Sequence, residues 1–476
     1  MTTKTTSRKA VLFSVCMAHF LMPFMMSAVG IALPAMGREF SASALQLGLV
    51  ETSYVLSAAI FLLAMGRFGD IHGRRRVFQV GLLIFSIFGG LISQAWSIET
   101  VIGLRFLQGM GGAMVMATTM AIVVSVFPAA ERGKALGIAI ASVYAGISCG
   151  PFFGGMLVSG FGWRSIFYLP VPLGLLTYAV VRLKIHEDWA EAKGEPFDWR
   201  GALVYAPSIL LLVSGVANLN RGWWAWGLLL LANLGLGLFV FLETHSDYPL
   251  LNITLLRENR VFALSNLAAL FNYAATFGVT FFLSLYLQYV KGMSPQQAGS
   301  LLIVQPIVQT LFSPLCGRLS DRVPAALVAT SGMTLCAIGL ALTASLTAAS
   351  PLSLVVLLLI LLGAGFALFS SPNVSMIMGS VAPRYLGIAS GLNATMRTLG
   401  MMTSMMIITL IFSILMHGQA VTLATQPAFL DSMRSALLVF CGLCVIGIGC
   451  SLGRVQRNSV PQETNPANAE EQNDQG

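Results

Sequence analysis

Charged side chains are scarce in this sequence. Asp, Glu, Lys and Arg together make up 10% of the chain, whereas hydrophobic residues make up 56%. A soluble domain usually carries about 25% charged residues. So little charge cannot cover the surface of a water-soluble protein of this length. The composition therefore predicts a membrane protein.

The sequence also lacks the signatures of several other protein classes. It contains no G-x-x-x-x-G-K-[ST] loop that would bind a nucleotide phosphate. The seven cysteines all fall in apolar stretches, and the C-x-x-C at Cys441 and Cys444 has no second pair or nearby histidine. Acidic residues in the apolar segments are too few for a catalytic cluster. We therefore expect no metal, no cofactor and no enzymatic activity.

What the chain does contain is a series of apolar segments long enough to cross a bilayer as helices. Spans of roughly 20 residues are needed, and about fourteen occur. They centre on residues 11–35, 45–66, 77–96, 100–126, 135–158, 163–182, 201–219, 224–242, 262–288, 296–317, 325–347, 351–379, 386–416 and 433–453. The sequence thus predicts an all-α membrane protein.

The basic residues predict the orientation of these spans. If the N-terminus lies in the cytoplasm and the spans alternate, most of the 27 Lys and Arg fall in cytoplasmic segments. Cytoplasmic loops of membrane proteins carry this excess. The net charge of +8 therefore indicates membrane topology and no nucleic-acid partner. We expect both termini to be cytoplasmic, in a plasma (inner) membrane.

The chain divides into two related halves. GRFGDIHGRRR at 66–76 is echoed by GRLSDR at 317–322, and each ends the second span of a six-span set. Such internal repeats are typical of transporters built from two bundles. We predict an N-terminal bundle over 1–182, a linker with two extra spans over 183–260, a C-terminal bundle over 261–454, and a disordered cytoplasmic tail over 455–476.

The loop at 66–76 predicts a conformational latch. Glycines allow a tight turn between two helices, and Asp70 can meet a helix N-terminus or an arginine across the bundle. The alternative is a positively charged membrane anchor. The residues of this predicted latch are Gly66, Asp70, Gly73, Arg74 and Arg75, with Gly317 and Asp321 in the shorter second copy.

Residues 141–157, ASVYAGISCGPFFGGML, form an unusual membrane segment. Glycines at about every fourth position leave a bare stripe for close helix packing, and Pro151 interrupts the backbone hydrogen bonding. We expect this stripe, which holds Gly146, Gly150, Pro151, Gly154 and Gly155, to face the other bundle. The alternative is a plain packing motif.

These segments resemble the fourteen-helix drug:proton antiporters of the major facilitator superfamily. The matching patterns are G-x-x-x-D-x-x-G-R-R at 66–75, R-x-x-Q-G beginning at Arg105, and G-x-x-x-G-P-x-x-G-G at 146–155. The resemblance implies the major facilitator fold, with two six-helix bundles and two inserted helices. It also implies secondary active transport, with Arg105 contacting substrate or controlling a nearby carboxylate. For Arg105, a buried structural salt bridge is the alternative.

The chain departs from that family at its expected proton carrier. Met25 stands where an aspartate usually precedes the A-L-P at 32–34. Glu51 is the acid placed well inside a helix and is our first candidate for proton coupling, with His19 second. Glu51 at the depth of Arg105 could instead neutralise that arginine or lie in the outer vestibule. A packing role is the alternative for His19.

Methionines offer a candidate substrate surface. Thioether side chains adapt to varied apolar ligands, and Met22, Met25 and Met26 lie on the first helix. Ordinary core packing is the alternative. We therefore predict a transporter that exports small hydrophobic or amphipathic compounds by proton antiport. The rivals are a proton-independent or differently coupled carrier of a small metabolite and, outside transport, a membrane receptor or membrane enzyme.

Overall fold

The protein is almost entirely helical. The computed structural model describes residues 6–42, 44–218, 222–293, 295–416 and 426–454, and these contain no β-strand. Thirteen of the described helical segments are long and apolar enough to cross a membrane, and Trp199–Gly215 is a shorter apolar helix. Together they account for the spans predicted from the sequence, which confirms the all-α membrane fold.

Six spans make up the first half. They are α1 (Arg8–Phe40), α2 (Ala44–His72), α3 (Arg74–Ile92), α4 (Ile98–Val126), α5 (Ala129–Phe161), and a sixth span divided into α6 (Arg164–Tyr168) and α7 (Pro170–Lys184). The division falls before Pro170, which lacks the backbone N–H that a continuous helix would need there.

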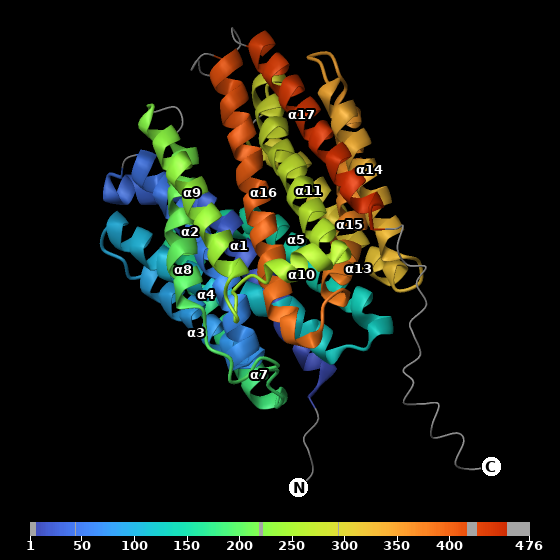
Figure 1. Cartoon of the computed structure of the whole chain (residues 1–476). Coiled ribbons are helices and arrows are strands. Elements are labelled where there is room, and N and C mark those ends of the chain that lie inside the picture. The colour runs from blue at the N-terminus through green and yellow to red at the C-terminus, as the bar shows by residue number, and fades with distance from the viewer. Residues whose placement is uncertain (1–5, 43, 219–221, 294, 417–425, 455–476) are drawn as a thin grey trace, which may run out of the picture.

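The second half repeats this arrangement. It contains α11 (Arg260–Leu285) continued by η2 (Tyr286–Val290), α12 (Pro295–Leu302) with α13 (Val304–Ser320), α14 (Ala325–Ala344), α15 (Leu352–Gly379), the short η3 (Pro383–Tyr385), α16 (Leu386–Leu415) and α17 (Gln426–Leu452). Its packing also repeats that of the first half: α1 packs on α5 as α11 packs on α16, and α2 on α4 as α13 on α15. Figure 1 shows the two sets of helices side by side.

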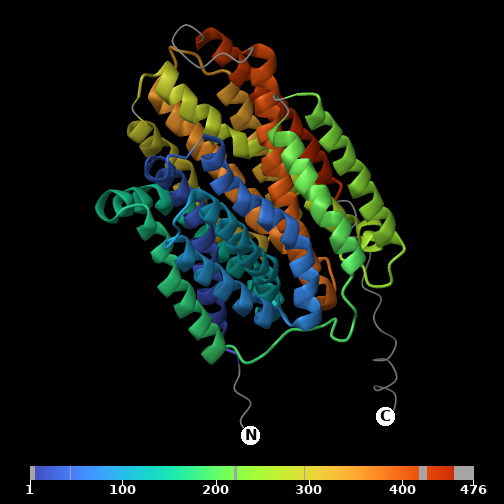
Figure 2. The same cartoon turned by 90° about the vertical axis from the view of Figure 1, so that its left-hand side faces the viewer.

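The inserted helices lie outside both sets. α8 (Trp199–Ala217) and α9 (Trp224–Thr244) pack against each other, and α10 (Ile253–Glu258) leads into α11. In Figure 2 the pair, drawn in green, runs along the flank of the molecule. Tyr205 of α8 is buried and donates a hydrogen bond to the carbonyl of Ala59 on α2 (3.3 Å). The insertion therefore attaches to the first half along α2.

Residues 185–198, here called the linker, cross one end of the molecule. We call this end the linker side and the opposite end the far side. The start of α1 and the end of α7 lie on the linker side, at the bottom of Figure 1. The two halves contact each other through α2 and α4 against α16, and through α5 against α13 and α15.

Candidate functional site

A buried carboxylate joins the halves on the linker side. Asp70, at the end of α2, accepts hydrogen bonds from the backbone N–H groups of Gly387 (2.9 Å) and Ile388 (3.0 Å). These donors belong to the first turn of α16, where N–H groups have no intrahelical partner and the helix dipole attracts negative charge. Arg74 also binds Asp70, at 2.6 and 2.8 Å. We call this arrangement the first clasp.

Glycines allow α2 and α16 to approach closely enough for the first clasp to form. A Cβ on Gly66 would lie 2.4 Å from the carbonyl oxygen of Gly387, and one on Gly391 would lie 2.8 Å from that of Leu62. Real Cβ contacts are longer than this, so a side chain at either position would force α2 and α16 apart. The first clasp therefore depends on direct contact between the backbones of α2 and α16.

A second clasp occupies the equivalent place in the other pair of helices. Asp321, just after α13, accepts hydrogen bonds from the backbone N–H groups of Gly133 (2.8 Å) and Lys134 (3.0 Å) in α5. A Cβ on Gly317 would lie 2.2 Å from the carbonyl oxygen of Gly133, and one on Gly137 would lie 2.6 Å from that of Ser313. The same carboxylate-and-glycine contact is therefore built twice, once from each half.

The two clasps differ in burial and charge compensation. The Asp70 and Arg74 side chains are fully buried. Arg74 also donates a hydrogen bond to the carbonyl of Pro383, a residue of the second half, at 2.5 Å. The position corresponding to Arg74 in the second clasp is Ala325. Asp321 is half-buried and borders a cleft of about 700 Å³. Water therefore competes for the second clasp more than for the first.

The linker crosses both halves beside the first clasp. Glu195 forms ion pairs with Arg67 of α2 and with Arg384 of η3 (2.9 Å). The backbone N–H of Ala192 donates to the carbonyl of Asp70 at 3.0 Å. Arg67 is almost completely buried. The linker therefore adds a charged bridge between the halves on the same side as the clasps.

Gly73 and Arg75 hold the linker against the loop between α2 and α3. Gly73 has a positive φ of 105°, and a Cβ there would lie 2.3 Å from Asp188 Oδ1. Asp188 accepts from the backbone N–H of Arg75 (3.2 Å) and pairs with Arg76 (2.9 Å). Burial raises the pKa of the Asp188 carboxyl, and Arg76 opposes that shift. Arg75 thus contacts the linker, whereas Arg74 contacts the second half.

The glycine stripe of α5 does not face the other bundle, contrary to the sequence expectation. A Cβ on Gly146 would lie 2.3 Å from the carbonyl oxygen of Phe20, and one on Gly150 would lie 2.6 Å from Ser27 Cβ. Gly154 approaches α1 in the same way, and a Cβ on Gly155 would meet open space. The stripe therefore packs within the first half, against α1.

The reason lies in helix geometry. Gly137, which contacts α13, and Gly146, which contacts α1, are nine residues apart on α5. At roughly 100° per residue, that spacing places them on opposite faces of the helix. The sequence pattern correctly predicted that another helix packs closely on this stripe, but it did not predict that this helix is α1. The side chain of Pro151 lies outside the described residues, although Pro151 itself falls within α5.

Arg105 and Glu51 lie near each other without forming an ion pair among the described contacts. Arg105 is buried; its Nε donates to the carbonyl of Val50 (3.2 Å) and its Nη1 to Gln108 Oε1 (2.8 Å). Its guanidinium carbon lies 4.4 Å from the ring centroid of Tyr54. Glu51 is exposed. Arg105 is thus held by groups of the first half, and the Glu51 side chain is not part of this set of contacts.

His19 is buried between α1, α4 and α5 with both ring nitrogens partnered. Nδ1 lies 3.2 Å from the carbonyl oxygen of Ala139, and Nε2 lies 2.8 Å from Thr119 Oγ1. A carbonyl only accepts, so Nδ1 carries the proton, and Nε2 can accept from the Thr119 hydroxyl, whose other acceptor is the more distant carbonyl of Met116 (3.3 Å). The neutral ring is fully satisfied, which is the arrangement expected of a packing residue.

The methionines of α1 are mostly enclosed in this conformation. Met22 and Met25 are buried in the core of the first half, whereas Met26 is exposed. Only Met26 therefore presents its thioether outside the core here.

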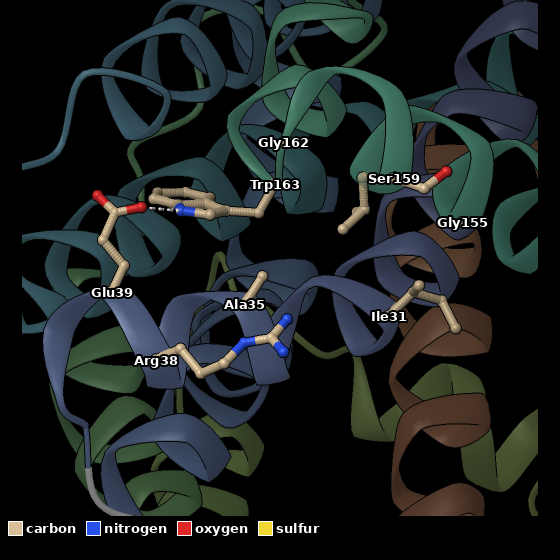
Figure 3. A pocket seen from close by; sticks show the side chains of 9 residues that line it. Ile31, Ala35, Arg38, Glu39, Gly155, Ser159, Gly162 and Trp163 are labelled. Atoms are coloured by element: carbon tan, nitrogen blue, oxygen red, sulfur yellow. Dashed lines mark hydrogen bonds between the residues drawn. The ribbon is translucent and has the colours of Figure 1, made fainter.

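A cleft opens on the far side between α1 and α5. It has a volume of about 710 Å³ and includes Arg38, Glu39 and Trp163 among its lining residues. Figure 3 shows the Trp163 indole N–H donating to Glu39, at 2.7 Å. This hydrogen bond is the main cause that lowers the pKa of Glu39, and Arg164 acts in the same direction. Gly155, where a Cβ would meet open space, also lines this cleft.

Several residues of the interface were not identified from the sequence. Gly133 with Gly137, and Gly387 with Gly391, are small-xxx-small pairs that a search for close helix contacts could have found. Glu195 lies in a polar segment with other charges, and nothing in its neighbourhood distinguishes it. Its role depends on Arg67 and Arg384, which are distant in sequence.

Comparison with known proteins identifies the family. Residues 15–258 and 265–473 match the model of the Major Facilitator Superfamily. The chain belongs to this superfamily. It is therefore a multi-pass membrane transporter, which confirms the resemblance drawn from the sequence motifs at the level of the superfamily.

Individual relatives support the assignment. The chain is 32% identical over 392 residues to the riboflavin transporter RibZ of Clostridioides difficile, covering 82% of this chain and 85% of that protein. It is 31% identical over 378 residues to the multidrug resistance protein Stp of Mycobacterium tuberculosis, covering 78% and 70%. The structure of the human organic anion transporter MFSD10 superposes with a TM-score of 0.67 over 94% of this chain and 100% of that one, at 15% identity, and supports the fold.

Proposed function

We propose that this major facilitator protein exports hydrophobic or amphipathic compounds by alternating access, driven by protons that flow inward. The observation that carries the proposal is the pair of clasps. Each is a carboxylate bound to backbone N–H groups of the opposite half, with glycines in contact beside it. Such contacts can open as two rigid bodies separate, which is what an alternating-access cycle requires.

The excess of Lys and Arg on the linker side supports a cytoplasmic location for that side. With this orientation, the termini lie in the cytoplasm and the clasps close the cytoplasmic end. The conformation described is then outward-facing. Resistance proteins such as Stp are similar to this chain, which favours export as the direction of transport.

Proton coupling rests on Glu51. It is the acid of the outer half of α2, it is exposed, and its Oε1 lies close to Gly30 of α1, where a Cβ would be 3.1 Å away. Arg105 lies within electrostatic range of Glu51. A proton on Glu51 would remove that attraction, so the protonation state of Glu51 can alter the contact between α1, α2 and α4. His19, satisfied as a neutral ring, is the weaker candidate.

Transport of a small metabolite is the second candidate function. The 32% identity to a riboflavin transporter favours it, and Met25 in place of the usual aspartate favours a different coupling. The two candidate functions predict different responses of transport to an imposed pH gradient.

The test uses the purified full chain in proteoliposomes with an imposed pH gradient. An amphipathic fluorescent dye and riboflavin are supplied in separate experiments. Proton-driven export predicts dye accumulation against its gradient, collapse by a protonophore, and loss of the pH response in Glu51→Gln. Dye movement that ignores the pH gradient in the wild-type protein would contradict proton coupling. Movement of riboflavin alone would support the metabolite carrier.

A further inference from the structure

Arg397 lies within a membrane-spanning segment of the second half and, in the part of the chain that the structure describes, has no ion-pair partner. Arg397 follows Gly387 of the first clasp by ten residues of α16, or about 15 Å at 1.5 Å per residue. With the first clasp placed at the edge of the hydrocarbon core, which is about 30 Å thick, this position is near the centre of the core. An arginine at that depth is costly unless it faces a partner or a water-filled space.

The neighbours of Arg397 on α16 show which way it faces. Ser390 donates to the carbonyl of Met116 on α4 (3.4 Å), and Ala394 packs against Leu62 and Ala113 of the first half. Residues at i, i+4 and i+7 share a helix face, so Arg397 is the next position on this face. Gly400, one turn farther along, contacts α11 within its own half, so Arg397 lies where the contacts of α16 pass from the first half to α11.

The guanidinium of Arg397 therefore faces the first half, just beyond the last close contact between the halves. It interacts electrostatically with His19 on α1, Tyr54 on α2 and Tyr144 on α5. Among the described residues, it forms no ion pair and no hydrogen bond, and it is half-buried. Of the acids on the neighbouring spans, Asp70 is paired with Arg74, and Glu51 lies within electrostatic range of Arg105.

Aromatic rings from both halves pack together around Tyr144, which is within electrostatic range of Arg397. The ring centroids of Tyr144 on α5 and Phe366 on α15 are 5.6 Å apart, and those of Phe366 and Tyr273 on α11 are 5.2 Å apart. Tyr144 interacts electrostatically with both Arg397 and Tyr273. An uncompensated guanidinium next to an aromatic group has the chemistry to bind a planar anion. The guanidinium pairs with a carboxylate or phosphate, and the rings pack on an aromatic body.

We propose that Arg397 binds the anionic group of the transported substrate and that Tyr144, Tyr273 and Phe366 hold its aromatic portion. The substrates of this transporter are then aromatic anions of amphipathic character. This inference rests on the proposed transport function and narrows its substrate class. Many drugs carry a basic group, and Arg397 would repel such a group at this position.

The test compares two dyes with the same ring system and opposite charge, the anion fluorescein and the cation rhodamine 6G. Binding to the purified full-length protein is measured by fluorescence anisotropy, without any gradient. We expect the wild-type protein to bind fluorescein more tightly than rhodamine 6G. Arg397→Gln should weaken fluorescein binding at least about tenfold, because a charge-assisted contact is lost. Arg397→Lys keeps the charge and should restore part of the affinity.

Two controls separate binding from folding. Arg434→Gln removes an exposed arginine of α17 and should leave the affinity for both dyes unchanged. Each variant is required to elute as the wild type does in detergent. If Arg397→Gln misfolds, the comparison between Arg397→Lys and the wild type still reports on the site, since lysine lacks the planar pair of donors and should bind fluorescein less tightly.

Three results would overturn the assignment: equal weakening of both dyes by Arg397→Gln, preference of the wild type for the cation, or binding of neither dye by the wild type. Vesicle transport distinguishes this inference from the proposed function. Arg397-dependent binding of fluorescein without any transport would contradict export while supporting the site. Export of rhodamine 6G with no effect of Arg397→Gln would support export while overturning the site.

Discussion

Replacing Asp70 with asparagine should open the linker side. Asparagine keeps one acceptor oxygen, so it can still accept from one of the two N–H groups of α16. Its other terminal atom becomes an NH₂ donor, which faces a second N–H donor at Gly387 or Ile388. The substitution also removes the negative charge at the N-terminus of α16 and leaves Arg74 buried beside a neutral partner.

The size of the effect follows from these contacts. A hydrogen bond to a charged group contributes about 1.5–3 kcal/mol, and one such bond across the interface is lost outright. A loss of about 2 kcal/mol changes an equilibrium roughly thirtyfold. Because Asp70 and Arg74 are fully buried, water does not replace the lost bond while the interface stays closed. We therefore expect the open fraction on the linker side to rise by at least about tenfold.

A cysteine reporter measures this change. Ala394 is buried on α16 against Leu62, Ala113 and Ala117, and it becomes accessible only when the halves separate. Ala394→Cys is introduced after the native cysteines are replaced, and its reaction with a water-soluble maleimide is followed over time. Asp70→Asn should accelerate labelling at least about tenfold. Glu39→Gln, which removes a carboxylate on the far side, is the matched control and should not. Equal labelling rates in Asp70→Asn and the wild type would refute the reasoning.

The same reporter tests the rest of the interface. Asp321→Asn should accelerate labelling less than Asp70→Asn does, because Asp321 is half-buried and water can replace its bonds; equal or larger acceleration would contradict this ranking. Gly137→Leu should accelerate labelling by holding α5 away from α13, whereas Gly150→Leu should lower the melting temperature without accelerating labelling, because its clash is with α1. The reverse pattern would show that the stripe of α5 belongs to the interface. Glu195→Gln should accelerate labelling at low salt and have a smaller effect at high salt, where the pair with the exposed Arg384 is screened. An identical effect at both salt concentrations would show that the Glu195 ion pair with Arg67, and not the one with Arg384, holds the linker.

The spans could be predicted from the sequence because each is fixed by its own composition. A run of about 20 apolar residues specifies a membrane helix without reference to its neighbours. The break at Pro170 was not predicted, although proline in an apolar run is its cause. Of the two partners proposed for Asp70 across the bundle, the helix N-terminus is present, whereas the arginine that binds Asp70 is Arg74, four residues along in the same half. The sequence could not name α16 as the helix, because that contact joins residues more than 300 positions apart.

The glycine stripe shows a different limit of sequence reasoning. A row of small residues specifies that some backbone approaches closely, and the pattern is the same whichever helix approaches. Helix α5 carries two such rows on opposite faces, one toward α1 and one toward α13. The longer row, which includes Gly146 and Gly150, matched the family motif and was assigned to the wrong partner. The shorter row, Gly133 and Gly137, makes the contact between the halves.

The position of Arg397 connects the proposed substrate site to the clasps. Arg397 and Gly387 lie on α16, and Tyr144 and Gly133 lie on α5, so each helix carries one residue of the proposed substrate site and one of a clasp. A ligand that bridges Arg397 and Tyr144 would add an attraction between the halves at mid-membrane depth. Helices move as rigid elements, so this attraction changes the balance between clasp-closed and clasp-open states only if the ligand fits one state better than the other. A small anion that contacts Arg397 alone would bind without shifting that balance, whereas an aromatic anion that reaches both halves would shift it. The aromatic residues would therefore contribute to transport as well as to affinity.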